Sequence, residues 1–372
     1  MRTMPSDTEL INSLLERVRA AASAGTPLLI RGGGSKDFYG EAPVGELLDT
    51  APLAGITSYE PSELVVTAGA GTKLADLEAL LAEKGQCLPF EPPHFAGGST
   101  LGGVVASGLS GPARASAGAV RDYVLGVKLI NGRGEHLAFG GQVMKNVAGY
   151  DVSRLMVGAM GTLGLITEVS LKVMSVAVAE ATLRFEFTQQ QALDRLNVWG
   201  GLPLPLNASC WLEDAGIGTL YLRLRGALAA VEAASASLGG ERLDKVRAAL
   251  DWKACRDQKL PWFTERSSGH DLWRLSVPQT APLLALPESP FIEWHGAQRW
   301  VRATPGQAGA VREAARAVGG SATLFIANPE YKTRATGRFD ALKPPLDRIH
   351  RELKREFDPA GIFNRGRLYP DF

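Results

Sequence analysis

The residues best suited to chemistry form a short turn near the start of the chain, Arg31-Gly32-Gly33-Gly34-Ser35-Lys36. Successive backbone N–H groups in a glycine turn point the same way and can bind an anion. Ser35 adds a hydroxyl group, and Arg31 and Lys36 add positive charge. The turn could therefore hold a pyrophosphate, although a purely structural turn would use the same residues.

Two familiar phosphate-binding motifs do not account for this turn. The P-loop pattern G-x-x-x-x-G-K-[ST] is absent. The dinucleotide fingerprint G-x-G-x-x-G opens a helix within a βαβ unit, whereas residues 38–43 (FYGEAP) have the composition of a loop. If the turn binds a phosphate, it does so outside both motifs.

A second glycine-rich segment, residues 92–118, indicates close approach of the backbone to a flat or extended ligand. Its glycines are Gly97, Gly98, Gly102, Gly103, Gly108, Gly111 and Gly118. A flexible linker would also be rich in glycine. A linker would not carry the apolar run Leu101, Val104, Val105, Ala106 and Leu109, so we favour a packed, ligand-facing segment.

A third glycine-rich segment, residues 145–173, ends in a strand expected over residues 165–173. Gly158, Gly161 and Gly164 punctuate the turn before that strand. Each of the three glycine-rich segments therefore lies beside an expected strand in the first half of the chain. Together they predict an elongated, phosphate-bearing ligand held by glycine turns.

Short strands and occasional helices surround these turns and predict an α+β fold. Strands are expected over residues 27–31, 47–49, 63–68, 122–131, 135–139, 181–187, 208–212, 219–224 and 322–327, with a strand, a turn and a second strand over 291–302. Helices are expected over residues 7–22, 72–84, 190–199, 227–238, 305–318 and 344–357. The order β–α–β–β–α after residue 178 is typical of a ferredoxin-like unit.

Composition excludes several classes of protein. The chain has 372 residues, enough for two domains, and a formal net charge of +1, which argues against nucleic-acid binding. No apolar run is long enough to span a bilayer, and residues 1–18 lack a secretory signal. The three cysteines, Cys87, Cys210 and Cys255, are too few for a disulfide framework or an iron–sulfur site, so we expect packed thiols in a reducing compartment.

The motifs RGGGSK, GGSTLGGVVASGLSG, KNVAGYDVSRLMVGAMGTLGLITEVSLKV and FDPAGIFN resemble the FAD-binding family of vanillyl-alcohol oxidase and p-cresol methylhydroxylase (PCMH) type. Within it, the chain is most similar to the E-type, FAD-containing subunits of bacterial glycolate oxidase. The resemblance implies a PCMH-type FAD-binding domain of two α+β subdomains (residues 1–175), then a smaller ferredoxin-like cap domain (176–345). Residues 346–372 would form a C-terminal helix and tail that return to the FAD domain.

The resemblance also implies which residues bind FAD. The pyrophosphate would lie on Arg31, Gly32, Gly33, Gly34, Ser35 and Lys36; the ribityl and flavin region on Thr100, Leu101, Gly102, Ala106, Ser107 and Gly108; and the adenosine half on Gly161, Gly164 and Ile166. Some relatives attach FAD covalently to a histidine in the first loop. This loop has no histidine, so we expect non-covalent FAD.

The second half of the chain lacks the catalytic motifs of relatives that oxidise 2-hydroxy acids. Those relatives carry H-x-G-D-G-N-x-H and a later E-H-G, which supply metal ligands and a general base. The counterparts here are residues 295–300 (HGAQRW) and residues 323–326, which are apolar apart from Thr323, so we assign no metal. His295 and Arg299 are the candidate catalytic residues. The alternatives are a buried, hydrogen-bonded histidine and an ion pair between Glu293 and Arg299.

The resemblance thus implies an FAD subunit of a multi-subunit glycolate dehydrogenase that oxidises a small 2-hydroxy acid. Its partners would be a homologous D-type flavin subunit and an iron–sulfur F-type subunit. The complex would be cytoplasmic, and any contact with the inner membrane would be made through partners. Two alternatives stay open: a self-sufficient flavin dehydrogenase and a non-catalytic structural paralogue. Residues 252–273, which are rich in tryptophan and basic residues, are a candidate partner surface.

Overall fold

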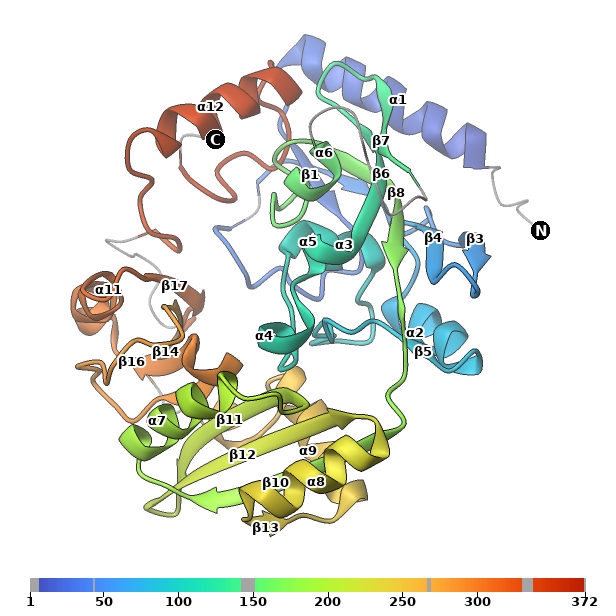
Figure 1. Cartoon of the computed structure of the whole chain (residues 1–372). Helices are drawn as coiled ribbons and strands as arrows, with labels where there is room; N and C mark the ends of the chain where they lie inside the picture. The colour runs from blue at the N-terminus through green and yellow to red at the C-terminus, as the bar shows by residue number, and fades with distance from the viewer. Residues whose placement is uncertain (1–6, 43, 142–150, 266–268, 330–336, 371–372) are drawn as a thin grey trace.

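The computed structural model describes residues 7–42, 44–141, 151–265, 269–329 and 337–370. Figure 1 shows two halves, one above the other. The upper half, here called the cradle half, holds residues 7–175 and returns at the end of the chain with α12 (Leu346–Phe357). The lower half, here called the cap half, holds the strands β10 to β17. Residues 145–150 of the third glycine-rich segment lie outside the described residues.

The elements of the cradle half before α12 are α1 (Asp7–Ala24), β1 (Leu28–Arg31), β2 (Glu46–Asp49), β3 (Ile56–Glu60), β4 (Val65–Gly69), α2 (Leu74–Glu83), β5 (Gln86–Cys87), α3 (Leu101–Ser107), α4 (Arg114–Ala117), α5 (Val120–Tyr123), β6 (Val124–Ile130), β7 (His136–Gly140), α6 (Val152–Leu155), β8 (Leu165–Lys172) and β9 (Met174–Ser175).

The elements of the cap half are β10 (Ala179–Glu186), α7 (Gln189–Gly200), β11 (Leu206–Asp214), β12 (Ile217–Gly226), α8 (Leu228–Leu238), β13 (Glu241–Arg242), α9 (Lys245–Arg256), α10 (Pro261–Thr264), β14 (Asp271–Ser276), β15 (Phe291–Glu293), η1 (Trp294–Gly296), β16 (Gln298–Ala303), η2 (Pro305–Gln307), α11 (Ala308–Arg316) and β17 (Ser321–Ile326).

The cradle half is built on two small sheets. β1 and β2 pair in parallel, and Leu28 also exchanges backbone hydrogen bonds with Ile362 and Asn364 near the end of the chain. The second sheet has the order β3-β4-β8-β6-β7, with every neighbouring pair antiparallel. Leu77 of α2 and Val104 of α3 are buried against this sheet, which explains why the helices carry apolar residues at helical spacing.

The cap half contains a single eight-stranded sheet of order β13-β10-β12-β11-β15-β16-β14-β17. The first four strands, with α7 and α8, reproduce the order of a ferredoxin-like unit. The last four strands have the same arrangement, read in the opposite direction across the sheet. Among the described residues, α11 is the one α-helix between these strands. The two units join edge to edge where β11 pairs with β15.

The end of the chain is fastened to the cradle half by a buried ion pair. Nζ of Lys354 lies 2.7 Å from Oδ2 of Asp358 and donates hydrogen bonds to the carbonyl oxygens of Thr162 (2.7 Å) and Phe363 (2.9 Å). Because a buried ammonium and carboxylate need partners for every polar atom, this arrangement fixes the tail beside the glycine turn near Thr162.

The expected α+β fold with PCMH-type FAD-binding architecture is confirmed. The structure adds detail to three expectations. Leu101–Ser107, within the second glycine-rich segment and not among the expected helices, is the helix α3. The cap half holds two joined ferredoxin-like units instead of one. Trp252 and Trp273 are 5% and 0% exposed, whereas Trp262 is partly exposed and Lys259 is exposed, so the partner surface at residues 252–273 stays a prediction; Arg266 lies outside the described residues.

Within the described residues, no helix combines the length and the apolar character needed to cross a bilayer. The division into residues 1–175, 176–345 and 346–372 stays a prediction.

Candidate functional site

The predicted phosphate turn begins where β1 ends, and the second glycine-rich loop packs directly against it. A Cβ atom on Gly33 would lie 1.3 Å from the carbonyl oxygen of Gly98, and one on Gly32 would lie 2.6 Å from Oγ1 of Thr100. Gly34 has a φ angle of +69°, which glycine adopts without steric cost. The glycines therefore allow two loops to meet at van der Waals distance.

Lys36 is buried beside this turn, and among the described residues no carboxylate lies at ion-pair distance. Its Nζ donates hydrogen bonds to Oγ of Ser99 (2.8 Å) and of Ser35 (3.2 Å), and lies 5.8 Å from the centre of the Phe95 ring. Burial lowers the pKa of Lys36 to about 8, with a weaker opposing effect of Asp257. A buried ammonium surrounded by hydroxyl groups and an aromatic ring is stabilised by a bound anion.

The opposite wall of the same groove is α3. Thr100 precedes this helix, and its Oγ1 accepts a hydrogen bond from the backbone N–H of Gly103 (3.3 Å). Ala106 and Ser107 lie at the other end of the helix and also face the groove. The groove thus runs along α3, which suits an extended ligand.

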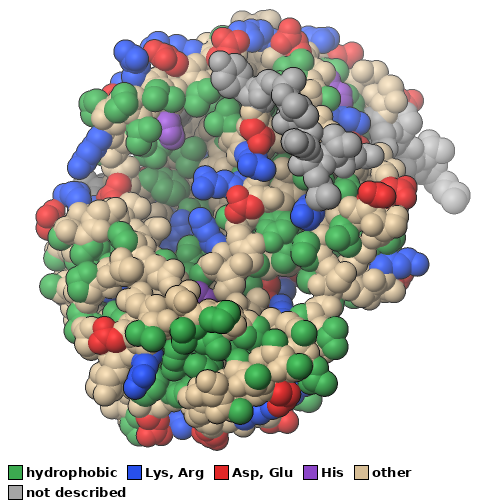
Figure 2. Space-filling model, viewed as in Figure 1, with side chains coloured by type: hydrophobic (Ala, Val, Ile, Leu, Met, Phe, Trp, Pro, Cys, Tyr) green, Lys and Arg blue, Asp and Glu red, His purple; other side chains and the backbone are tan. Residues whose placement is uncertain are grey.

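Of the predicted FAD-binding residues, nine line this one groove: Arg31, Gly32, Gly33, Gly34, Ser35, Lys36, Thr100, Ala106 and Ser107. Figure 2 shows a hollow between the two halves on this face, with Lys and Arg side chains gathered around it. The donor set, which combines an amide-rich turn with an unpaired buried ammonium, fits a pyrophosphate-bearing cofactor.

The other predicted residues do not line this groove; they are Leu101, Gly102, Gly108, Gly161, Gly164 and Ile166. Leu101 of α3 and Ile166 of β8 are buried in the hydrophobic core of the cradle half. Gly102 packs on Ala70, because an added Cβ would lie 2.8 Å from the Cβ of Ala70. Their contact with FAD stays a prediction; in the structure they support the wall.

The groove includes residues from the end of the chain that sequence reasoning missed. Oδ1 of Asn364 accepts a hydrogen bond from the backbone N–H of Ile30 (2.7 Å), and its Nδ2 donates one to the carbonyl oxygen of Met160 (2.6 Å). Arg367 donates hydrogen bonds to the carbonyl oxygens of Lys36 and Asp37. Asn364 could have been predicted, because it ends the motif FDPAGIFN, which was expected to return to the FAD domain.

In the cap half, aromatic rings fill the position of the missing catalytic motifs. Phe325, from the counterpart of E-H-G, lies with its ring centre 4.9 Å from that of Trp300 and 5.4 Å from that of Phe38. Tyr39 and Phe95 contact the same ring. The cavity that remains here has a volume of about 20 Å³, which has room for about one water molecule.

Glu293 lies at the edge of this small cavity and accepts hydrogen bonds from three neutral donors. They are Nε1 of Trp300 (2.6 Å), Nε2 of Gln298 (2.9 Å) and Sγ of Cys255 (3.4 Å). Burial raises the pKa of Glu293. Arg299 does not contact it, because its guanidinium donates hydrogen bonds to the carbonyl oxygens of Gly296, Pro282 and Ala281.

His295, the other candidate catalytic residue, bridges the two halves. Its Nδ1 lies 2.9 Å from Oγ of Ser209 in β11, and its Nε2 lies 3.0 Å from Oγ of Ser116 in α4. Burial lowers the pKa of His295 to about 4. Both ring nitrogens have partners, so the geometry is that of a neutral, structural histidine.

The sequence comparisons agree with this arrangement. A family model described as an FAD binding domain matches residues 9–140. The glycolate oxidase subunit GlcE of Escherichia coli (strain K12) is 44% identical over 368 residues, which is 99% of this chain and 100% of that protein. The chain belongs to this GlcE family. It is an FAD-dependent oxidoreductase, and its cofactor is FAD.

More distant relatives match less than half of the chain. The glycolate oxidase subunit GlcD of Bacillus subtilis (strain 168) is 30% identical over 48% of this chain and 38% of that protein. The D-lactate dehydrogenase of Archaeoglobus fulgidus is 30% identical over 45% of this chain and 37% of that protein. These relatives support FAD-dependent oxidation of hydroxy acids as the general chemistry of the family.

A solved structure of alkyldihydroxyacetonephosphate synthase has the same fold. It matches with a TM-score of 0.64 at 15% identity, covering 95% of this chain and 74% of that one.

Proposed function

We propose that this chain is an FAD-holding accessory subunit of a multi-subunit 2-hydroxy-acid dehydrogenase that oxidises glycolate to glyoxylate. A homologous D-type flavin subunit would bind the substrate, and an iron–sulfur F-type subunit would accept the electrons. The named relatives GlcE and GlcD support the assignment to a glycolate oxidase.

One observation supports the accessory role. Nine of the predicted FAD-binding residues line an open groove, whereas aromatic side chains occupy the position of the missing catalytic motifs. Relatives need space there for a hydroxy acid, a base and metal ligands. Here Phe325 and Trp300 occupy that space, and about 20 Å³ remains. A molecule of glycolate, with five non-hydrogen atoms, does not fit in a cavity with room for one water.

The chain's own residues would hold and orient the cofactor. Backbone amides of Gly33 and Gly34 would bind the pyrophosphate, and Lys36 would neutralise part of its charge. Asn364 and Arg367 would keep β1 and the phosphate turn in place through the backbone atoms that they bind. When bound, FAD would accept a hydride, that is two electrons and a proton, from a carbon–hydrogen bond of a substrate. His295 would act as a positioning residue between α4 and β11.

Steady-state turnover tests the proposal. The purified, FAD-loaded chain is assayed with glycolate and an artificial electron acceptor, alone and after addition of the homologous D-type subunit. Turnover should be near background for the chain alone and should rise with the D-type subunit above the rate of that subunit by itself. Brisk turnover by the chain alone would reject the accessory role.

A second candidate, the self-sufficient dehydrogenase, is favoured by Arg274. This side chain lines the small cavity and donates a hydrogen bond to the hydroxyl of Tyr39 (3.1 Å). No carboxylate among the described residues pairs with it, so it could bind a substrate carboxylate if the aromatic rings moved apart. Turnover by the chain alone that is lost in Arg274→Met and in His295→Ala, with FAD retained, would select this candidate.

A further inference from the structure

Glu293 is a buried carboxylate that neither FAD binding nor the packing of the sheet explains. It lies in β15, opposite Cys210 of β11 and Gln298 of β16. It is 4% exposed, and no Lys or Arg of the described chain contacts it. Replacing such a group by an apolar residue is often neutral for stability or even stabilising, so its presence points to a use for the proton that it can bind.

Two cavities lie near this carboxylate: Glu293 lines one of them, and its hydrogen-bond partner Cys255 lines both. The small cavity lies on one side, lined by Glu293 and by residues 109–112, which follow the FAD groove along the chain. On the other side is a cavity of about 480 Å³, here called the large cavity, between α9, α10 and the strands β10 to β12. Cys255 lines both cavities.

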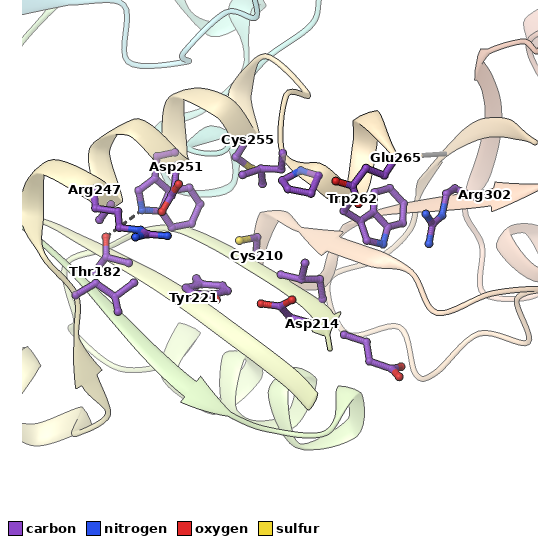
Figure 3. A pocket seen from close by; sticks show the side chains of 17 residues that line it. Thr182, Cys210, Asp214, Tyr221, Arg247, Asp251, Cys255, Trp262, Glu265 and Arg302 are labelled. Carbon is purple, nitrogen blue, oxygen red and sulfur yellow. Dashed lines mark hydrogen bonds between the residues drawn. The ribbon is translucent and has the colours of Figure 1, made fainter. Parts of the chain in front are cut away.

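Figure 3 shows the large cavity, with Cys210 and Cys255 labelled on its wall. The Cys210 thiol lies beside that of Cys255. Asp214, Arg247 and Asp251 also line this cavity and are exposed, so it opens to solvent. The order from the FAD side to solvent is therefore the small cavity, Glu293, Cys255 and then the large cavity.

Both protonation states of Glu293 find partners in this geometry. Oε2 accepts from Trp300 and Gln298 in either state. Oε1 accepts from the Cys255 thiol when the carboxylate is charged. When Oε1 carries the proton, it can donate to Sγ of Cys255, whose own proton then turns toward Cys210. A proton can thus arrive and leave with no polar group left unpaired.

We propose that Glu293 and Cys255 carry protons between the FAD side of the molecule and the large, solvent-open cavity. The inference rests on the proposed function, because Ala106 and Ser107, expected at the flavin end of the FAD groove, lie only a few residues before Leu109 in the lining of the small cavity. Reduced FAD loses two electrons and two protons when it is reoxidised, and one-electron acceptors take only the electrons. The protons need a path to solvent, and Glu293 and Cys255 lie between the small cavity and the solvent-open large cavity.

The transfer conserves protons and changes no oxidation state. A proton from the small cavity forms an O–H bond at Oε1 of Glu293. That bond breaks when the proton passes to Sγ of Cys255, while the S–H proton of Cys255 leaves to water in the large cavity. The carboxylate and the thiol are then restored.

The charged and titratable groups around Glu293 are few. Cys210 faces it from β11, Cys255 from α9, and Arg256 and Arg274 line the same small cavity. The negative charge of Glu91 opposes ionisation of Glu293, in the same direction as burial. Protonation of Glu293 therefore occurs at a higher pH than that of an exposed glutamate.

Infrared difference spectroscopy of the FAD-loaded chain, reduced with light and then reoxidised, tests the proposal. We expect a signal from the C=O bond of a protonated carboxylic acid that changes with the redox state of the flavin and vanishes in Glu293→Gln. Reoxidation by ferricyanide should be slowed about tenfold or more in Glu293→Gln and in Cys255→Ala. Glu265→Gln, which changes an exposed carboxylate of the large cavity, is the matched control.

The outcomes separate the two proposals. A chain that takes up no FAD contradicts the proposed function. A chain with a flavin spectrum but without a redox-linked carboxylic-acid signal overturns the proton path and leaves the proposed function standing. If Glu293→Gln does not fold, the infrared signal of the unaltered chain and the reoxidation rate of Cys255→Ala decide; an unchanged rate in that variant also overturns the path.

Discussion

The FAD groove and the small cavity between the two halves are built from opposite kinds of residue. Glycine and small polar residues line the groove, so backbone atoms are exposed to the ligand. At the small cavity, Phe38 and Phe95 of the cradle half meet Trp300 and Phe325 of the cap half, so side chains occupy the space. A hydroxy-acid dehydrogenase needs both regions open. This difference is the basis of our proposal that the chain holds the cofactor while a partner subunit binds the substrate.

The largest effect should come from adding one methyl group to the groove. Gly33→Ala places a Cβ atom 1.3 Å from the carbonyl oxygen of Gly98, so the two loops must separate. FAD affinity should fall by about a hundredfold or more, measured by quenching of flavin fluorescence. Gly97→Ala is the matched control, because nothing lies within 4 Å of its added Cβ. Equal affinities in the two variants would contradict the close packing of the loops.

On the cap side, removing an aromatic ring should affect stability and leave the cofactor bound. Phe325 is 1% exposed, so Phe325→Ala should lower the free energy of unfolding by about 3–5 kcal/mol, measured by urea denaturation. The variant should still bind FAD and should not acquire glycolate turnover, since the base and the metal ligands remain missing. Val178→Ala, at an 86% exposed position, should change the stability little. Loss of FAD with full stability would reverse the assignment of the two regions.

Low pH should weaken the contact between the halves at His295. The folded-state pKa of about 4 lies below the ordinary histidine pKa of about 6.5, so the unfolded chain binds the proton first as the pH falls. Stability from this group is complete above about pH 6.5 and is lost toward pH 4, by about 3 kcal/mol in total. His295→Asn should remove that part of the pH dependence in denaturation curves. An identical pH profile in the variant would show that folding does not lower the pKa of His295.

The smallest of these effects concerns the charge in the groove. Lys36→Met should weaken FAD binding about tenfold to a hundredfold, because a charge-assisted contact with the pyrophosphate is lost. In the unaltered chain, FAD affinity should be constant below about pH 8 and fall above it, since free Lys36 then lacks the proton that the bound anion favours. Titrations across this range should show no such fall in Lys36→Met, whereas Lys253→Met, on the exposed side of α9, should behave like the unaltered chain.

The phosphate turn could be predicted from sequence because all its residues are adjacent. Arg31 to Lys36 act as one local unit, and their composition suffices to suggest an anion site. Helix α3 was missed, although Leu101, Val104 and Val105 have helical spacing, because glycine is unfavourable within helices. The structure supplies the reason: Gly102 packs on Ala70, and Thr100 caps the helix.

Contacts between distant segments could not be predicted in the same way. Asn364 reaches Ile30 across more than three hundred residues, and Cys255 reaches Glu293 from a helix on the far side of the sheet. The second ferredoxin-like unit was also missed. In this unit, residues 277–290 connect β14 to β15 without a helix, whereas a regular ferredoxin-like unit has its first helix at that place. Composition alone does not show which strands such a loop connects.

The most direct test of the account is a visible absorption spectrum of the purified single chain, followed by anaerobic addition of glycolate. The account predicts a flavin spectrum that stays oxidised until the homologous D-type subunit is added. A flavin spectrum that bleaches with glycolate alone would contradict it, because the chain would then possess an active site of its own despite the aromatic rings that fill the cap side.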